Sequence, residues 1–239
     1  MELAKYKYLI FSLLGFLVIS LGIVVVIYYN QPEVISSEPL TCNKILENGD
    51  AENRIDIVFF FDNVDDSEAQ DYINYFLGIE PFESNKDKFN FYSVNVAPEC
   101  EIQNGILICY SKSLVKSSAV CPNDYLIVLS EQSSSTRSSA YLNLMSINTA
   151  TSKSVLIHEF GHVFANLADE YVPSTIPSGS KNCVSSCDKF KSEIDECNLG
   201  CSYESYYRSI NSGIMRTLST TNFGKFDEKI VEENLDEYK

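Results

Sequence analysis

A long apolar run is the first feature of the chain. Residues 8–29, YLIFSLLGFLVISLGIVVVIYY, contain no charged side chain. A run of this length is sufficient to cross the hydrocarbon core of a bilayer as a helix. The apolar part of a secretory signal is shorter and ends at a small-residue cleavage site, and neither property is evident here. We therefore expect a transmembrane helix over residues 8–29, with the lipid bilayer as its partner.

Charged residues on either side of this run predict its orientation. Two lysines precede it within residues 1–7, whereas two glutamates follow it within residues 30–41. Positive charge is favoured on the cytoplasmic side of a membrane. We therefore expect residues 1–7 in the cytoplasm and the rest of the chain outside it, in a single-pass protein of the cell membrane. Residues 30–41, which carry two prolines, are expected to form a stalk.

Apolar patterns predict a sheet in the domain that follows. Residues 55–62, IDIVFFFD, are apolar at nearly every position, as expected of a strand buried on both faces of a sheet. Alternation of apolar and polar positions predicts further strands at 89–97, 105–110, 125–129 and 140–147. Between the last two, the serine-rich stretch 130–140 is expected to be a mobile loop.

Helical spacing predicts two helices. Residues 67–77 carry apolar side chains on one helical face, with Ser67 as the expected N-cap. Within residues 155–171, an apolar stripe repeats at intervals of four, three and four, which predicts an amphipathic helix with its back against a core. This stripe consists of Leu156, Phe160, Val163 and Leu167. Strands that precede helices in this order predict an α/β domain with a mixed sheet and one long central helix.

The composition limits the class of protein. The chain has 239 residues, of which 45% are hydrophobic, and this is enough for one large globular domain with an appendage. Its formal net charge of −15 repels phosphate groups, and we therefore expect no nucleic-acid partner.

Eight cysteines, all of which follow the apolar run, indicate the compartment. An even number on one side of a membrane segment predicts disulfide bonds in an oxidising environment. Among the first four, we expect Cys109 to pair with Cys121 because these two are close in sequence.

The last four cysteines have the spacing C-x3-C-x9-C-x3-C. On two short antiparallel helices, cysteines four residues apart share a face, and we therefore expect the bonds Cys183–Cys201 and Cys187–Cys197. These bonds would tie an insert at about residues 180–203. The alternative is a second zinc site, because four thiolates can bind Zn²⁺.

Both histidines of the chain lie in one short motif, HEFGH, at residues 158–162. On an α-helix, residues four apart are offset by about 40° around the axis and about 6 Å along it. His158 and His162 therefore project from one face toward a common ion, while Glu159 stands beside it. This H-E-x-x-H spacing predicts two ligands for Zn²⁺ and one general base. The alternative is two unrelated histidines on a helix.

The third ligand requires a break in the helix. No third histidine exists, so a carboxylate, a thiolate, a tyrosine or water must complete the site. On a straight helix, Asp169 would lie about 10 Å beyond His162 along the axis, out of reach. Asn166 tolerates the left-handed conformation, and Pro173 ends helical structure soon afterwards. A reversal at Asn166 would bring Asp169 or Glu170 back to the ion.

The stretch HEFGHVFANLADEY, residues 158–171, resembles the signature of the M64 peptidases, the IgA-peptidase family among the metzincin-like zinc proteases. The likeness extends to IDIVFFFDNVDDSEAQ, PFESNKDKFNFYSVNV, DYLIVLS and GIMRT, and so to most of residues 54–230. It implies a metzincin-like zinc protease domain over residues 42–239, with a mixed sheet and a central active-site helix. The implied cofactor is Zn²⁺, and the implied partner is a protein or peptide substrate.

The resemblance also implies a role for each matching residue. His158 and His162 become zinc ligands, and Glu159 becomes the general base that takes a proton from zinc-bound water. Asp169 becomes the third ligand, with Glu170 as the alternative. Met215, in GIMRT, becomes the Met-turn beneath the metal.

The chain departs from the family pattern at two positions near this motif. Ala165 stands where the metzincin helix usually breaks at a glycine, and Ala168 stands where the third ligand commonly falls. Tyr171 and Arg216 are the candidates to stabilise the oxyanion or contact substrate. The family likeness further implies that strand 140–147 pairs with the backbone of an extended substrate.

These observations lead to one expected function and two rivals. We expect a membrane-anchored, zinc-dependent endopeptidase that hydrolyses peptide bonds of extracytoplasmic protein substrates. Serine-triad and cysteine-protease chemistry both require a histidine that this motif leaves unavailable. One rival is a catalytically inactive cell-surface binding module that retains the metallopeptidase fold, although Glu159 is intact. The other is a structural zinc protein with a closed, four-ligand site.

Overall fold

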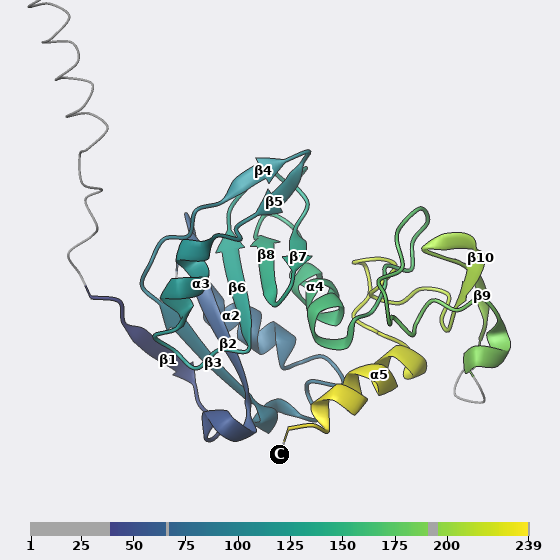
Figure 1. Ribbon diagram of the computed structural model, residues 1–239, viewed down its shortest axis with the longest axis horizontal. Coiled ribbons are helices and arrows are strands. Elements are labelled where there is room, and N and C mark those ends of the chain that lie inside the picture. Colours follow the sequence, from purple (N-terminus) through teal and green to yellow (C-terminus); the bar gives the residue numbers. More distant parts are fainter. Residues whose placement is uncertain (1–38, 66, 191–195, 239) are drawn as a thin grey trace, which may run out of the picture. The chain divides into compact units, whose positions relative to one another are not determined.

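The computed structural model describes residues 39–65, 67–190 and 196–238. The chain divides into two units, Met1–Pro39 and Leu40–Lys239, and only the second is described in detail (Figure 1). The expected transmembrane helix at 8–29, the segment 1–7 and most of the expected stalk lie outside the described residues. Within the described residues, no helix combines the length and apolar character needed to span a membrane.

A six-stranded mixed sheet forms the centre of the second unit, with the strand order β1-β3-β2-β6-β8-β7 (Figure 1). Its four inner strands are parallel and almost entirely buried: β2 (Ile55–Asp62), β3 (Phe89–Val94), β6 (Tyr125–Ser130) and β8 (Leu144–Asn148). The antiparallel edge strands are β1 (Cys42–Leu46) and β7 (Ser139–Tyr141). The sheet therefore combines parallel and antiparallel pairs, and the predicted mixed sheet is confirmed. The apolar run at 55–62 forms a central strand because such a run needs cover on both faces.

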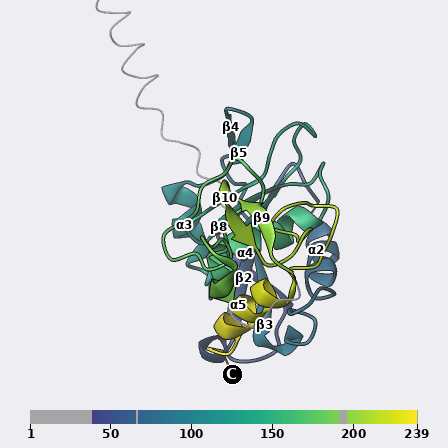
Figure 2. The same ribbon diagram turned by 90° about the vertical axis from the view of Figure 1, so that its right-hand side faces the viewer.

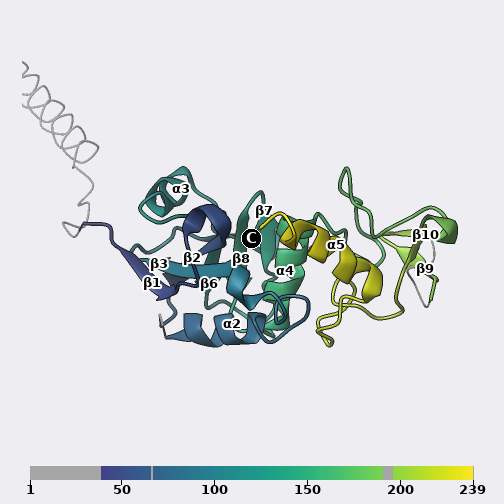
Figure 3. The same cartoon turned by 90° about the horizontal axis from the view of Figure 1, so that it is seen from below.

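Helices and a hairpin cover the two faces of this sheet. One face packs against α2 (Glu68–Phe76), α4 (Ser154–Ala165) and α5 (Lys225–Leu235). The other face packs against α3 (Lys112–Ser118) and the hairpin of β4 (Glu101–Gln103) and β5 (Ile106–Ile108). The views in Figure 2 and Figure 3 place α2 and α3 on opposite sides of the sheet. The domain therefore has three layers, and the sheet lies in the middle one.

Phenylalanine rings fix the position of α4 against the sheet. Phe160 meets Phe76 and Phe82 edge-on, with ring centroids 5.0 and 5.4 Å apart, and stacks on Phe164 at 5.0 Å. Such pairs add to the free energy of apolar burial and restrict ring orientation. Ten of the twelve residues of α4 are buried, so the helix is enclosed on nearly every side. The sequence predicted an amphipathic helix instead. Val163, one member of the predicted stripe, is only partly buried.

The predicted strand at 140–147 is a hairpin. Its two arms are β7 and β8, joined at Leu142, whose φ of 54° is left-handed. Since β8 pairs with β6 on one side and β7 on the other, it has no edge to offer to a substrate. The expectation that the whole stretch pairs with substrate was therefore wrong. The sequence predicted one strand in place of two because the alternation of apolar and polar residues continues across the turn. The edge strand is β7.

Several elements were not predicted from the sequence. These are β1, β4, α3, α5, and a second small sheet of β9 (Asn198–Cys201) and β10 (Tyr203–Arg208). Short 3-10 helices occur at Ala51–Asn53, Lys86–Lys88 and Cys187–Phe190. The predicted helix at 67–77 is α2, and Ser67 occupies its N-cap position without a side-chain capping hydrogen bond.

All eight cysteines form disulfide bonds, which fits an exported domain. The predicted pairs Cys183–Cys201 and Cys187–Cys197 are confirmed, although Cys187 begins a 3-10 helix and Cys201 ends β9. Because these thiols are oxidised, the alternative of a second zinc site at the four cysteines fails.

The expected pair Cys109–Cys121 was wrong. The observed bonds are Cys42–Cys121 and Cys100–Cys109. In the β4–β5 hairpin, Glu101 lies opposite Ile108, so the residues flanking this pair, Cys100 and Cys109, face each other. Strand register therefore overrides proximity in sequence.

The Cys42–Cys121 bond is expected to contribute more stability than the Cys187–Cys197 bond. Their sequence separations are 79 and 10 residues, and a longer closed loop removes more entropy from the unfolded chain. Replacing both cysteines of a pair by alanine should lower the free energy of unfolding by about 4.5 kcal/mol for the first pair and about 3 kcal/mol for the second. Urea unfolding of the two double variants measures this difference, and an equal or reversed ranking would contradict it.

Candidate active site

The helix that carries both histidines ends in a sharp reversal. Asn166, directly after α4, is left-handed, with φ 51° and ψ 36°. Its backbone N–H donates to the His162 carbonyl at 3.1 Å, and that of Leu167 donates to the Gly161 carbonyl at 3.2 Å. The side-chain amide of Asn166 donates to the Ser178 carbonyl at 3.1 Å. The predicted break at Asn166 is confirmed, and it directs the following residues back along the helix.

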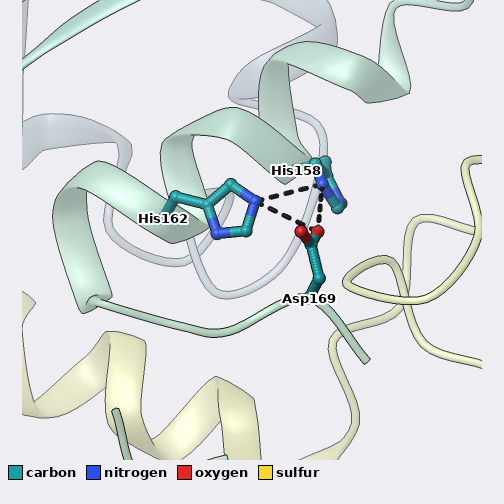
Figure 4. A group of neighbouring side chains, drawn as sticks. All are labelled: His158, His162 and Asp169. Carbon is teal, nitrogen blue, oxygen red and sulfur yellow. Dashed lines mark hydrogen bonds and ion pairs between the residues drawn. The ribbon is translucent and has the colours of Figure 1, made fainter. Parts of the chain in front are cut away.

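The reversal brings three side chains together (Figure 4). The Nε2 atoms of His158 and His162 lie 3.1 Å apart, and Oδ1 of Asp169 lies 3.1 and 3.3 Å from them. These atoms form a group with the spacing that a single metal ion requires. The second carboxylate oxygen, Oδ2 of Asp169, accepts a hydrogen bond from the Ser174 hydroxyl at 3.0 Å.

Hydrogen bonds on the far side of each imidazole fix its tautomer. Nδ1–H of His158 donates to the Ile214 carbonyl at 2.9 Å, and Nδ1–H of His162 donates to the Leu167 carbonyl at 2.7 Å. A carbonyl oxygen only accepts, so each neutral ring presents the lone pair of Nε2 to the centre of the group.

Three electron-pair donors therefore face one another. Oδ1 of Asp169 is buried and receives no hydrogen bond from the described residues. Burial alone would raise the pKa of Asp169, but N–H donation and positive charge from His158 and His162 in their protonated forms hold that pKa well below its usual range. Two imidazole nitrogens and one ionised carboxylate form a donor set that suits Zn²⁺. The residues present therefore fit a divalent cation.

The segment that carries Asp169 is held on both sides. Asn182 binds the backbone of Ala168 twice, accepting from its N–H at 2.8 Å and donating to its carbonyl at 2.9 Å. The N–H of Glu170 donates to the Met215 carbonyl at 2.8 Å, and the Ser202 hydroxyl donates to the Asp169 carbonyl at 2.6 Å. The sequence did not predict this role of Asn182. The one feature of the sequence that points to it is its position next to the disulfide-bonded Cys183.

Glu170, the alternative ligand, lies apart from the histidine group. Its carboxyl is fully buried and faces Asp227 and Asn182 in the interior. Burial and the neighbouring Asp227 raise the pKa of Glu170 well above its usual range. Burial likewise raises the pKa of Asp227 to about 8. Of the two predicted alternatives, Asp169 is the one that the fold brings to the histidines.

Met215 packs against the active helix. It is fully buried, and a Cβ atom added to Gly161 would lie 2.8 Å from its sulfur. Only glycine allows this approach, because real Cβ atoms essentially never come so close to another heavy atom. The residue before it, Ile214, accepts the hydrogen bond from His158. The turn at 213–217 therefore contacts both α4 and the segment after it.

A cleft of about 300 Å³ opens beside the histidine group. Its lining includes Val155, His158, Glu159, Tyr171, Arg216 and Leu218. Burial raises the pKa of Glu159, and the imidazoles of His158 and His162 oppose part of this shift. Burial also raises the pKa of Tyr171 to about 12, so the phenol stays protonated at neutral pH. The fold thus gathers the predicted base and both oxyanion candidates in one place.

A larger cavity, of about 470 Å³, lies elsewhere. Its lining includes Lys181, Val184, Phe226 and Glu233, and none of the predicted site residues contributes to it. The chemistry of the donor set, rather than cavity size, therefore identifies the candidate site.

Comparison with known proteins agrees with this geometry. Residues 100–182 match the family model of IgA Peptidase M64. The resemblance noted from the sequence is thereby confirmed over this range, which contains α4, the whole of the motif at 158–171 and Asn182. No curated protein matches the chain. The M64 match indicates a peptidase, a hydrolase with a protein or peptide substrate, and the His-His-Asp group is its possible metal site.

Asn182→Ala is expected to weaken zinc binding. The variant removes both hydrogen bonds to Ala168 and so loosens the segment that holds Asp169. Loss of hydrogen bonds that position a metal ligand typically raises a metal dissociation constant by about tenfold or more. Titration with zinc and a competing chelator measures this change. Asn85→Ala, which removes an amide bond to the Pro81 carbonyl away from the site, is the control. Equal zinc affinity in both variants would contradict a positioning role.

Asp227→Asn is expected to make the free energy of unfolding less sensitive to rising pH. The carboxyl of Asp227 holds its proton up to about pH 8 when folded but only to about pH 4 when unfolded. Its contribution to stability is therefore full below about pH 4 and is lost as the pH rises to about 8. The neutral amide removes this loss.

Urea unfolding at pH 5 and pH 8.5 tests this expectation. The charged groups near Asp227 are Glu170 and Glu228, and Arg208 and Arg216 lie near Glu170; all four remain in the variant. Asp236→Asn, the same change at an exposed position after α5, is the control. If wild type and Asp227→Asn lose the same free energy of unfolding between the two pH values, the expectation is wrong.

Proposed function

We propose that this chain is a membrane-anchored, zinc-dependent endopeptidase whose catalytic domain faces outside the cytoplasm. The observation that carries the proposal is the convergence of His158, His162 and Asp169 beside Glu159 in one cleft. The M64 match, which spans this motif, supports the same reaction.

The proposed chemistry divides among a few side chains. When bound by His158, His162 and Asp169, Zn²⁺ would lower the pKa of water and polarise the scissile carbonyl. Glu159 is buried next to this group, and its raised pKa moves it toward the working range of a general base. It takes the proton of the attacking water and passes it to the leaving amine. The Nδ1 bonds to Ile214 and Leu167 hold both imidazoles in the tautomer that binds metal.

We assign the oxyanion contact to Tyr171 in preference to Arg216. The Tyr171 phenol lies close enough to Asp169 for a hydrogen bond, and its raised pKa keeps it a donor at neutral pH. A neutral donor near the scissile carbonyl stabilises the charge that develops on its oxygen. Arg216 lines the same cleft, but its guanidinium is a permanent cation that suits a carboxylate.

Further features support a metzincin-like fold. Met215 lies against the active helix, as the Met-turn of that fold would. The edge strand β7 follows residues that line the cleft, and its outer backbone groups suit pairing with an extended substrate. The uncharged run at 8–29 and the four disulfide bonds support an anchored, exported domain.

Glu159→Gln is expected to lower peptide hydrolysis by about 10²- to 10⁴-fold, the usual contribution of a general base. The full chain, purified in a nonionic detergent, is incubated with a mixture of protein substrates, and zinc content is measured in parallel. Glu131→Gln changes an exposed carboxylate and is the control. The Glu159→Gln variant should keep its zinc, because Glu159 is outside the ligand group.

The outcomes separate the rival functions. A chelator should abolish cleavage, and added Zn²⁺ should restore it. Zinc bound by a wild-type protein that cleaves nothing would overturn the peptidase and favour a binding module. Equal cleavage by wild type and Glu159→Gln would show that the activity does not arise from this site. Purified protein that takes up no zinc would overturn the proposal altogether.

A further inference from the structure

The cleft beside the histidine group carries more positive than negative side chains, whereas the chain as a whole is acidic. The protein has 33 acidic and 18 basic residues. Among the described residues that line the cleft, however, Glu159 is the single carboxylate, and two arginines, Arg137 and Arg216, contribute positive charge. These are two of the four arginines in the sequence. A cleft with more positive than negative side chains, in a chain of net negative charge, attracts anionic ligands that the rest of the surface repels.

Arg137 is held in place by its backbone. Its N–H donates to the Gly105 carbonyl at 2.9 Å, and its carbonyl accepts from the Leu107 N–H at 2.8 Å. The Asn148 amide donates to the Ser133 and Thr136 carbonyls, both at 2.8 Å. The stretch 130–140, expected to be a mobile loop, is therefore anchored on both sides of the cleft-lining residues.

Arg216 is held by the turn that carries Met215. Its N–H donates to the Gly213 carbonyl at 3.0 Å, and its Nη1 approaches the Glu170 carbonyl at 3.4 Å. A guanidinium has five N–H donors, so most of those of Arg216 remain available. Within the part of the chain that the structure describes, neither Arg137 nor Arg216 forms an ion pair with a carboxylate, and both side chains are exposed.

Arg137 also lies within electrostatic reach of the reacting groups. Arg137 lines the same cleft as Glu159 and Tyr171. A ligand group bound by Arg137 would therefore lie close to the bond that these residues act on.

We propose that Arg137 and Arg216 form a carboxylate-binding subsite and that the protein selects peptides which place a carboxylate there. The planar guanidinium binds a carboxylate through two parallel hydrogen bonds, and two such groups in one cleft favour an anionic side chain over its neutral amide. The carboxylate comes from an aspartate or glutamate near the scissile bond or from the C-terminus of the peptide. This inference rests on the proposed function for the position of that bond.

Four matched fluorescent peptides distinguish the two sources. They differ only by glutamate or glutamine at one position and by a free or amidated C-terminus. Binding is measured by anisotropy on zinc-loaded, full-length Glu159→Gln protein, and hydrolysis is measured on wild type. We expect the preferred carboxylate to improve binding by about fivefold or more over its neutral counterpart, and added salt to reduce this ratio.

Variants of the two arginines test the assignment. Arg137→Gln and Arg216→Gln, each in the Glu159→Gln background, should bring the ratio of affinities toward one while the neutral peptide binds as before. Arg137→Lys should keep part of the preference, and Arg137→Glu should reverse it. Lys116→Gln removes one positive charge from an exposed position on α3 and should leave the ratio unchanged. Melting temperatures confirm that each variant is folded.

The outcomes for the subsite and for the peptidase are separable. Arginine-dependent binding without hydrolysis by wild type would support the subsite and overturn the peptidase. Hydrolysis at equal rates for all four peptides, with equal binding, would overturn the subsite and support the peptidase. An Arg137→Gln variant that loses affinity for charged and neutral peptides alike would show a structural role and overturn the subsite.

Discussion

The left-handed turn at Asn166 is the constraint on which the candidate site depends. A helix that carries only two histidines offers a metal two ligands, and a straight continuation would take Asp169 away from them. The turn reverses the chain within one residue, and Oδ1 of Asp169 then lies 3.1 Å from Nε2 of His158. The three-ligand donor set and the hydrogen bond that orients His162 both follow from this reversal.

Parts of the chain that are distant in sequence hold the returning segment. Because residues 168–170 belong to no helix or strand, their backbone groups need partners from elsewhere. Asn182 supplies two, the Met215 carbonyl supplies one, and Ser202 supplies another. The disulfide Cys183–Cys201 ties the residues next to two of these partners to each other. The insert and the methionine turn thus support the same short stretch.

The sequence predicts features that repeat or that one residue type controls. The run at 55–62 predicted a buried strand, and Asn166 predicted the helix break, because few residues accept a positive φ. Features set by distant partners escaped prediction. The helix α5 is mostly polar and packs through a narrow apolar face, so its pattern is weak. The roles of Asn182 and Glu170 depend on the residues that surround them in the fold, which the sequence around each one does not reveal. The hairpin at 139–148 escaped because alternation runs through its turn.

The contact between Gly161 and Met215 has a consequence for how such chains diverge. The fourth position of the H-E-x-x-H motif is nominally unrestricted, yet here the sulfur of Met215 occupies the space that a side chain would need. A larger residue at 161 is compatible with this packing only where a smaller one replaces Met215. The two positions are therefore expected to vary jointly during evolution, and the methionine constrains the motif from a remote turn.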